Sequence, residues 1–205
     1  MKNFFISSMY NKIVYIAIIL IFSTTQAMAV KEKDIEVKMK SDISKITALI
    51  RDNKIKKDKK IKKISAIVNE VFDYKLMSKI SLGKRWKTLS KTEKSTFIDS
   101  FTLKLKASYV DKLMLYTSGN ISVGELKKLK PNRIKLYTKL TRNNSKYDIT
   151  YKFYKNRKKQ EWFIYDVEVT GVSIIKTYRN QFSEFLSTKK FKDLLKELNK
   201  KPKNS

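Results

Sequence analysis

The stretch Trp162–Ser173, with the sequence W-F-I-Y-D-V-E-V-T-G-V-S, has the pattern of a strand that ends at a glycine and leads into a helix. Its residues alternate between two unlike faces, with the period of two that a strand requires. One predicted face is apolar and consists of Phe163, Tyr165, Val167 and Val169, while the other turns acidic at Asp166 and Glu168. After Gly171, apolar residues recur at helical spacing. The stretch therefore predicts a strand, a sharp turn at the glycine and a helix.

Two runs before this stretch have the same strand period. Turn residues separate them at Asn143-Asn144-Ser145 and follow them at 156–160, and a further short strand is indicated around 121–126. Together these segments predict an antiparallel meander with one apolar face. The two runs contribute Ile134, Leu136, Thr138, Leu140, Tyr147, Ile149, Tyr151 and Phe153 to that face.

Helical spacing dominates the rest of the chain. Amphipathic helices are expected over about 32–53 and about 61–72, and a short helix ends near Gly83, a natural C-cap. Ser90 and Glu93 form a capping box that opens a longer helix. Its apolar stripe consists of Phe97, Phe101, Leu105 and Tyr109.

The order of these elements indicates the fold class. Helices, then a meander, then two closing helices are typical of an α+β fold with an antiparallel sheet packed against helices. The chain after residue 29 is long enough for one domain with a real core. Within it we expect a helical part over about 32–118, a sheet over about 121–170 and C-terminal helices over about 173–199.

The first 29 residues have the pattern of a secretory signal peptide. Lys2 and Lys12 give a positive start, an apolar run covers ten residues at 13–22, and Ala27-Met28-Ala29 is a small-x-small cleavage site. The alternative is an uncleaved membrane anchor, but crossing a bilayer takes roughly 20 apolar residues. We therefore expect cleavage after Ala29 and a soluble exported domain over 30–205.

Composition narrows the class of partner. The chain has no cysteine, so it rests on its core without disulfides, as suits a bacterial periplasmic protein of this size. Its net charge is +28, and only six of its 47 basic residues are arginine. Such a lysine bias often reflects an AT-rich genome, although a basic surface also favours anionic lipid headgroups. Nucleic acid is the usual partner of so basic a chain, but the export signal argues against it.

Several kinds of catalytic site are excluded by what the chain lacks. Without histidine or cysteine it has no Ser-His-Asp triad, no cysteine nucleophile and no zinc site with the usual ligands. Gly119 and Gly124 have the spacing of a phosphate-binding loop, but Glu125 stands where that loop needs lysine. Ser173 lacks the second glycine of a nucleophile elbow, and we interpret it as a helix N-cap.

The carboxylates leave an alternative open. Asp166 and Glu168 share one strand face, where they could carry out acid/base chemistry or form ion pairs with lysines; we favour the ion pairs. Asp73 lies between two apolar stretches and is expected to cap the following helix. Arg179 could hold a lipid phosphate through its rigid guanidinium or form a surface ion pair.

Three segments, in order, resemble the MlaC family, the periplasmic phospholipid carriers also called toluene-tolerance proteins. The first runs from Val71-Phe72-Asp73-Tyr74 through Leu76-Met77-Ser78 to Leu82-Gly83-Lys84-Arg85-Trp86. The second is Ser90-Lys91-Thr92-Glu93 with the aromatic stripe after it, and the third is Trp162–Phe182. Together they cover the chain from about residue 60 to its end. The resemblance implies a curved, cone-like sheet of the nuclear-transport-factor type with an added helical part.

The resemblance also implies a function. It indicates a carrier that shuttles phospholipid between the outer and inner membranes and maintains outer-membrane lipid asymmetry. An outer-membrane lipoprotein complex and an inner-membrane ATP-binding-cassette complex would be its partners. Phospholipid would be cargo, and we expect no cofactor, no metal, no catalytic residue and a monomer. Two alternatives stay open, namely an acid/base enzyme acting on an apolar substrate and a periplasmic adaptor with a filled core.

Aromatic residues are the positive signal for a pocket. Eleven tyrosines and eleven phenylalanines fall largely on the predicted inward faces, as an ordinary core or as the lining of a cavity for acyl chains. Arg179 is the candidate headgroup contact. The predicted lipid pocket consists of Phe72, Met77, Trp86, Phe97, Phe101, Leu105, Tyr109, Tyr147, Ile149, Tyr151, Phe153, Phe163, Tyr165, Val167, Val169, Gly171, Val172, Ile175 and Tyr178.

Overall fold

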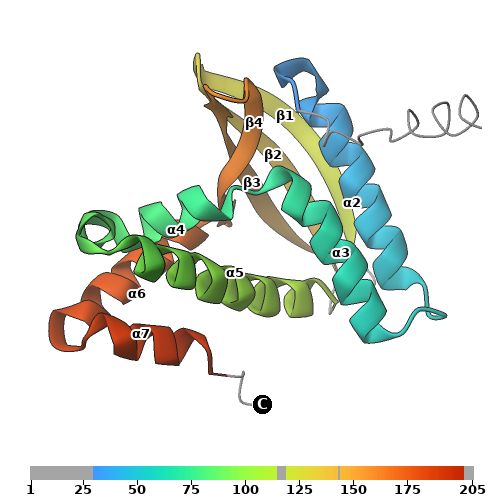
Figure 1. Ribbon diagram of the computed structural model, residues 1–205. Coiled ribbons are helices and arrows are strands. Elements are labelled where there is room, and N and C mark those ends of the chain that lie inside the picture. Colours follow the sequence, from blue (N-terminus) through green and yellow to red (C-terminus); the bar gives the residue numbers. More distant parts are fainter. Residues whose placement is uncertain (1–29, 115–118, 143, 201–205) are drawn as a thin grey trace, which may run out of the picture.

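A computed structural model describes residues 30–114, 119–142 and 144–200 (Figure 1). Within these ranges a curved, unclosed antiparallel sheet packs against helices, so the predicted α+β class is confirmed. The helical elements are η1 (Glu32–Asp34), α2 (Ile35–Arg51), α3 (Lys57–Val71), α4 (Tyr74–Leu82), η2 (Gly83–Thr88), α5 (Lys91–Met114), α6 (Ile174–Thr188) and α7 (Phe191–Leu198). The strands are β1 (Asn120–Lys130), β2 (Arg133–Arg142), β3 (Ser145–Asn156), β4 (Glu161–Val169) and β5 (Val172–Ser173).

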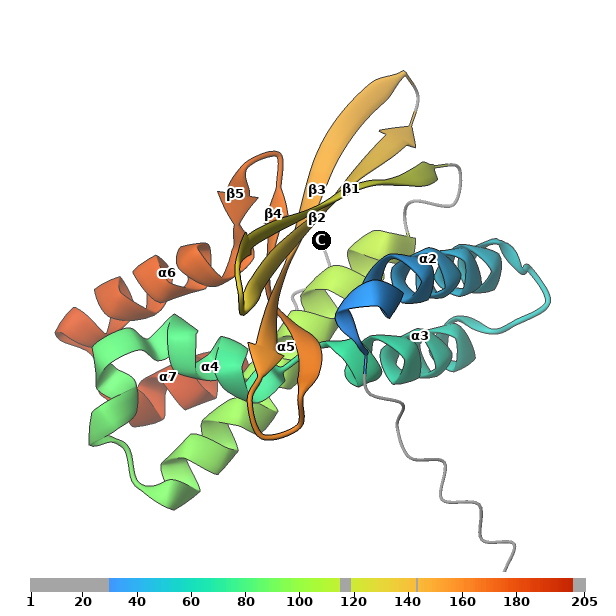
Figure 2. The same cartoon turned by 90° about the horizontal axis from the view of Figure 1, so that it is seen from above.

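The strands follow one another across the sheet in chain order, β1 to β5, as the predicted meander requires. The helices divide into two groups around this sheet (Figures 1 and 2). The α2–α3 hairpin lies along the sheet on the side of β1, whereas α4, α6 and α7 gather beyond β5. The long helix α5 runs from the second group back towards α3.

One extra residue in β4 changes which side chains face the core. Lys152 pairs with Asp166 but Phe153 pairs with Ile164, so Tyr165 has no partner and forms a β-bulge. The side-chain alternation therefore shifts by one position at Tyr165. The apolar face of the sheet then consists of Ile134, Leu136, Thr138 and Leu140 in β2, Tyr147, Ile149, Tyr151 and Phe153 in β3, and Trp162, Ile164, Val167 and Val169 in β4.

The bulge makes half of the β4 prediction wrong. Val167 and Val169 lie on the apolar face as predicted, but Phe163 pairs with Tyr154 on the opposite face. Trp162 and Ile164, which the simple alternation placed outside the core, are 1% and 0% exposed. For β2 and β3, which pair without interruption, the predicted face is confirmed.

Two large clusters of buried side chains share the interior. The helical cluster contains Phe97, Phe101 and Leu105 of α5, and it packs against α6 and α7. The ring of Phe101 meets Tyr178 edge to face with 5.0 Å between centroids, and Phe97 meets Phe182 in the same way at 5.7 Å. The sheet cluster lies between the apolar face and α2. The aromatic stripe of α5 is thus buried against helices and belongs to the helical cluster.

The outer edge of β4 is covered along most of its length. The backbone N–H of Trp162 donates to the carbonyl of Val30 at 3.0 Å. Phe72 forms a parallel bridge with Ile164, and the N–H of Asp73 donates to the carbonyl of Ile164 at 2.9 Å. An uncovered strand edge exposes backbone groups that invite aggregation. Distant parts of the chain satisfy these groups here and join the helices to the sheet.

The predicted helix ends are confirmed where the structure describes them. Asp73 accepts from the N–H of Leu76 at 2.8 Å and caps α4, which ends at Gly83 with φ of +55°. Ser90 and Glu93 form both hydrogen bonds of the capping box before α5. The predicted end of that helix at Gly119 lies next to residues outside the described part. The two-residue strand β5 was not predicted.

The two faces of β4 give the first testable prediction. Trp162→Ala should lower the free energy of unfolding by about 3–5 kcal/mol, because it empties a large, fully buried site. Phe163→Ala should cost only about 1–2 kcal/mol, since Phe163 is half-buried on the opposite face. Urea denaturation followed by circular dichroism measures both. A larger cost for Phe163→Ala would contradict the bulged register.

Candidate functional site

The apolar face of the sheet is closed at one end and open at the other. Near Trp162 and Ile164 it is completely buried, under Ile35 and Met39 of α2 and Val71 of α3. At the opposite end, apolar side chains are exposed to an extent unusual for a core face. Val172 is 62% exposed, and Val169 and Tyr147 are each 39% exposed. We call these three residues, with Ile149, the open end of the apolar face.

Pairing in the sheet shows that the open end is one surface. Val169 pairs with both Ile149 and Val172, and residues paired across antiparallel strands point to the same face. Tyr147 lies two residues from Ile149 and therefore also points to this face. Further in, burial raises the pKa of Tyr151 to about 12. This tyrosine thus stays neutral at physiological pH and adds no charge to the face.

The open end is held by a two-residue turn with unusual backbone. Thr170 and Gly171 join Val169 to Val172, and both have positive φ, of +50° and +80°. A two-residue hairpin turn needs such angles, which glycine adopts freely and a β-branched residue does not. The N–H of Thr170 donates to the carbonyl of Asp148 at 2.7 Å, which fixes the turn against β3. The strained residue thus lies directly beside the exposed valines.

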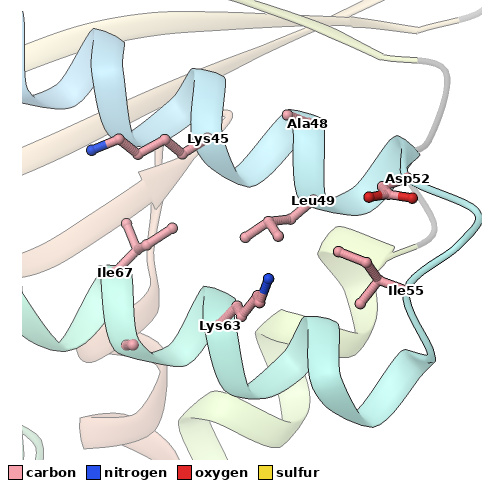
Figure 3. Close-up of a pocket in the computed structure, with 8 residues that line it drawn as sticks. Lys45, Ala48, Leu49, Asp52, Ile55, Lys63 and Ile67 are labelled. Atoms are coloured by element: carbon pink, nitrogen blue, oxygen red, sulfur yellow. The ribbon is translucent and has the colours of Figure 1, made fainter.

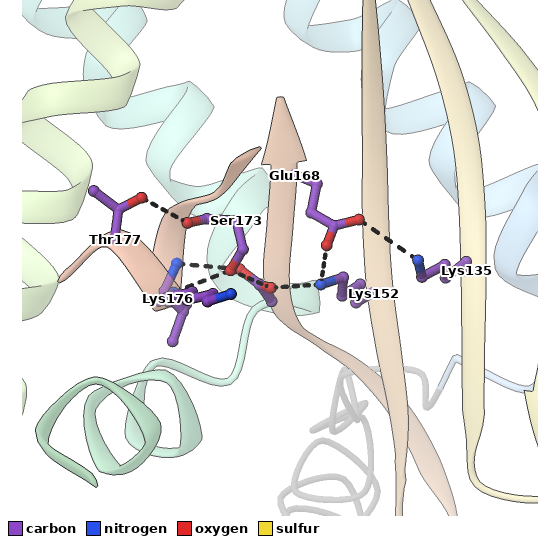
Figure 4. Close-up of polar contacts among 8 residues, drawn as sticks. Lys135, Lys152, Glu168, Ser173, Lys176 and Thr177 are labelled. Carbon is purple, nitrogen blue, oxygen red and sulfur yellow. Dashed lines mark hydrogen bonds and ion pairs between the residues drawn. The ribbon is translucent and has the colours of Figure 1, made fainter. Parts of the chain in front are cut away.

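Behind the turn, on the opposite face of the sheet, polar groups join β4 to α6 (Figure 4). Asp166 is 5% exposed and accepts three hydrogen bonds, from Lys152 Nζ at 3.0 Å, Ser173 Oγ at 2.7 Å and the N–H of Ile175 at 3.1 Å. Glu168 forms ion pairs with Lys152 and with Lys135. The interpretation of these carboxylates as lysine partners is confirmed.

The two carboxylates also determine the ionisation of Lys152. Burial opposes its positive charge, but hydrogen bonds to Glu168 and Asp166 outweigh that effect, so the pKa of Lys152 is raised. Ser173 caps α6 as predicted, accepting from the N–H of Lys176 at 3.0 Å while it donates to Asp166. The carboxylate of Asp166, whose charge Lys152 balances, therefore holds the first turn of α6 in place.

A hollow of about 440 Å³ opens at this junction, where Lys152, Asp166 and Glu168 line it together with Tyr165, Gly171, Lys176 and Arg179. Arg179 is exposed on α6 and lies close to Gly83, where an added Cβ would stand 3.1 Å from its Nε. The positive φ of +55° at Gly83 explains why a glycine follows α4, since the exposed Arg179 side chain could shift to make room for a Cβ. The role of Arg179 as a headgroup contact stays a prediction.

A second polar contact on this face joins the sheet to the helical cluster. Tyr154 donates a hydrogen bond to Asp73, the residue that caps α4. Burial and this contact raise the pKa of Tyr154 to about 12, so the donor keeps its proton. The guanidinium of Arg133 lies over the rings of Tyr154 and Tyr165, at 5.6 and 5.2 Å from their centroids. Tyr165 thus belongs to a cation–π cluster on the face opposite the one predicted.

The predicted pocket residues therefore lie in four places. Met77, Trp86, Phe97, Phe101, Leu105, Ile175 and Tyr178 belong to the helical cluster, with Phe72 packed against both clusters. Ile149, Tyr151, Phe153, Val167, Val169, Tyr147 and Val172 lie on the apolar face, Gly171 in its turn, and Phe163 and Tyr165 on the opposite face. The side chain of Tyr109 is outside the described part. As lining for a ligand, all of these residues remain a prediction.

The predicted pocket left out the side chains that close the apolar face. Ile35, Met39 and Val71 are nearly or completely buried there, together with Ile134 and Leu136, which were predicted on the face but not in the pocket. The stripe of α2 was visible at helical spacing. Nothing in the periodicity indicated that α2 would cover this particular part of the sheet.

The strained turn leads to a stability prediction. Thr170→Asn should raise the free energy of unfolding by about 1 kcal/mol, because Asn-Gly adopts two positive φ angles more readily than Thr-Gly. Thr141→Asn, in the extended strand β2, is the control and should be neutral or destabilising. Thermal melts of both variants measure these changes in stability. A destabilised Thr170→Asn protein would show that the threonine is not strained.

The polar junction between β4 and α6 leads to a second stability prediction. Asp166→Asn should lower the free energy of unfolding by about 2–4 kcal/mol, because it leaves Lys152 with one carboxylate fewer and places an amide among three donors. Glu168→Gln should cost less, since the side chain of Glu168 is 20% exposed, against 7% for Asp166, and it accepts no backbone hydrogen bond at α6. Equal costs in urea denaturation would refute the anchoring role of Asp166.

Among the described residues, no helix has the length and apolar character needed to span a membrane. Within the same ranges, no group of three or more acidic side chains is placed to hold a metal ion.

Comparison with known proteins places the chain in a family. No curated protein matches its sequence. Among similar solved structures is a phospholipid-binding protein from Ralstonia solanacearum, determined in complex with a phospholipid. It is 18% identical, the match covers 80% of this chain and 94% of that chain, and the TM-score is 0.68. The family model described as MlaC protein matches residues 40–200. Because that match covers most of the sequence, the chain belongs to the MlaC family.

Proposed function

We propose that this protein is a periplasmic phospholipid carrier and that the open end of its apolar face receives the acyl chains. The observation that carries the proposal is the exposure of Val172, Val169 and Tyr147 on a face that is otherwise core. A stable domain ordinarily buries such a surface, and an exposed apolar patch marks a binding site. Membership of the MlaC family and the phospholipid bound to the Ralstonia protein support lipid as the ligand.

The energetics explain why a carrier needs such a face. Each methylene in contact with water costs ~0.8 kcal/mol, so a lipid with about 30 methylenes costs on the order of 25 kcal/mol to expose. Contact with the apolar side chains of the open end would offset part of that cost. The more of the acyl chains the carrier covers, the closer transfer between bilayer and carrier comes to isoenergetic, in either direction.

Direction must then come from outside the chain. We propose that an outer-membrane lipoprotein complex and an inner-membrane ATP-binding-cassette complex give and take the lipid, and that the protein thereby maintains outer-membrane lipid asymmetry. Cleavage after Ala29 would release the carrier into the periplasm. The carrier would need no cofactor. Arg179 and Lys176, beside the hollow behind Gly171, are the proposed phosphate contacts.

The acid/base enzyme is the weaker alternative. It would need a free carboxylate directed at the apolar surface. Asp166 and Glu168 lie on the opposite face of β4, where lysines and backbone donors occupy their oxygens. Lipid binding at the apolar face requires no acid/base chemistry from these two carboxylates.

A matched pair of valine variants tests lipid binding. Val172→Asp introduces a charge at the open end and should reduce co-purifying phospholipid at least about tenfold, because acyl chains would then contact a carboxylate. Val37→Asp makes the same change on α2 at a valine that is 70% exposed, and it should leave lipid content unchanged. Native mass spectrometry and lipid extraction measure both.

The outcomes separate the three functions. Circular dichroism first confirms that both variants are folded, which their exposure favours. Phospholipid in the wild type and its loss only in Val172→Asp support the carrier. Full lipid occupancy in Val172→Asp would show that the lipid binds elsewhere on the protein. An apolar metabolite in place of phospholipid indicates the enzyme, and a wild-type protein without any bound lipid indicates the adaptor.

A further inference from the structure

The outer side of the α2–α3 hairpin carries a groove that the lipid proposal does not use. The groove has a volume of about 590 Å³ and runs between the two helices (Figure 3). Its floor is apolar, with Leu49 and Ala48 from α2, Ala66 and Ile67 from α3, and Ile55 from the connecting loop. Two of these residues are alanines, so the floor is wide enough for another chain to come close.

This side of the hairpin is not the side that covers the sheet. In α2, Ile35 and Met39 are buried in the sheet cluster, whereas Ile50 is buried with Ile64 between α2 and α3. Leu49 packs against that pair, away from the sheet cluster, and Ala48 is exposed. The groove is therefore a second apolar surface, separate from the open end of the apolar face.

Lysines surround the groove. Lys45 and Lys63 line it directly, and in Figure 3 Lys63 and Leu49 project towards each other from the two helices. Ile55 also lines a neighbouring hollow of about 550 Å³ at the tip of the hairpin. That hollow adds Lys54, Lys56, Lys59 and Lys62. The six lysines face only two lining carboxylates, Asp52 and Asp58.

These six lysines differ from the lysines that join elements of the fold. Lys38, Lys128 and Lys152 each form ion pairs with carboxylates of other elements. Among the described residues, no side-chain hydrogen bond or ion pair is formed by any of the six groove lysines, and Asp52 accepts instead from the backbone N–H of Lys54. The groove thus combines an apolar floor with positive charge that the chain itself does not neutralise.

We propose that the α2–α3 groove docks an acidic amphipathic helix of a partner protein. An amphipathic helix lays its apolar face in a hydrophobic groove between helices, at the 8–10 Å interaxial distance that small residues such as Ala48 and Ala66 permit. Its acidic flanks would meet Lys45, Lys59 and Lys63. A membrane surface fits less well, because insertion into lipid needs protruding apolar side chains and these line a concave floor.

The docking proposal does not depend on lipid carriage. A single helix in a groove buries an interface at the small end of the range, which is typical of transient encounters. Positive charge around the groove would also speed association with an acidic partner and make it sensitive to salt.

A synthetic peptide tests the proposal. The probe is a labelled helix of about 18 residues, five turns, with leucines on one face and glutamates on the others. Fluorescence anisotropy should show binding that weakens with salt, and amide resonances of Ala48, Leu49, Ala66 and Ile67 should shift on titration. A peptide of the same composition without the helical period should not bind.

Matched charge reversals locate the site. Lys59→Glu/Lys63→Glu reverses two groove charges one turn apart on α3, and it should weaken peptide binding at least about tenfold, which corresponds to about 1.4 kcal/mol. Lys192→Glu/Lys196→Glu makes the same change on α7 and should leave binding within about twofold of the wild type. Phospholipid content should be unchanged in both variants, which keeps this test independent of the lipid test.

Several results would overturn the proposal. Equal weakening by both double variants would mean that the peptide senses net charge alone. Resonance shifts confined to residues outside the groove, or equal binding of the aperiodic peptide, would place the contact elsewhere. Binding to phosphatidylglycerol vesicles that is lost only in Lys59→Glu/Lys63→Glu, without peptide binding, would make this a membrane-facing surface instead.

Discussion

The extra residue at Tyr165 is the constraint on which the rest of the structure depends. Before it, β4 directs Trp162 and Ile164 to the apolar face; after it, the same strand directs Asp166 away from that face and towards α6. Without the bulge, the strand could not bury its tryptophan and also present a carboxylate to the first turn of α6. The apolar face, the polar junction and the position of the helical cluster all follow from that shift of one residue.

The sequence analysis succeeded where local pattern decides and failed where one residue or one partner decides. Alternation placed every apolar residue of β2 and β3 on the right face because those strands pair without interruption. It failed in β4 because no glycine or proline marks the bulge. The stripe of Phe97 and Phe101 was found from its spacing, but spacing reveals that a face is buried and not which element buries it. The open end could not be predicted, since exposure depends on what lies opposite.

The roles of the lysines also depend on where the fold places them and not on their number. A net charge of +28 says little about which lysines matter. In the fold, Lys152 and Lys135 hold the carboxylates of β4, and Lys38 pairs with Asp42 within α2 and joins α2 to α3 through Glu70. These residues join elements of the fold through paired charges. The six groove lysines of the α2–α3 hairpin form no such side-chain contacts among the described residues.

The hydrogen bond between Val30 and Trp162 has a consequence for the order of folding. The strands pair with neighbours in sequence, so most of the sheet closes through short loops and can form early. The first described residue, however, bonds to a strand more than 130 positions later. The N-terminal segment cannot reach its final place until β4 exists.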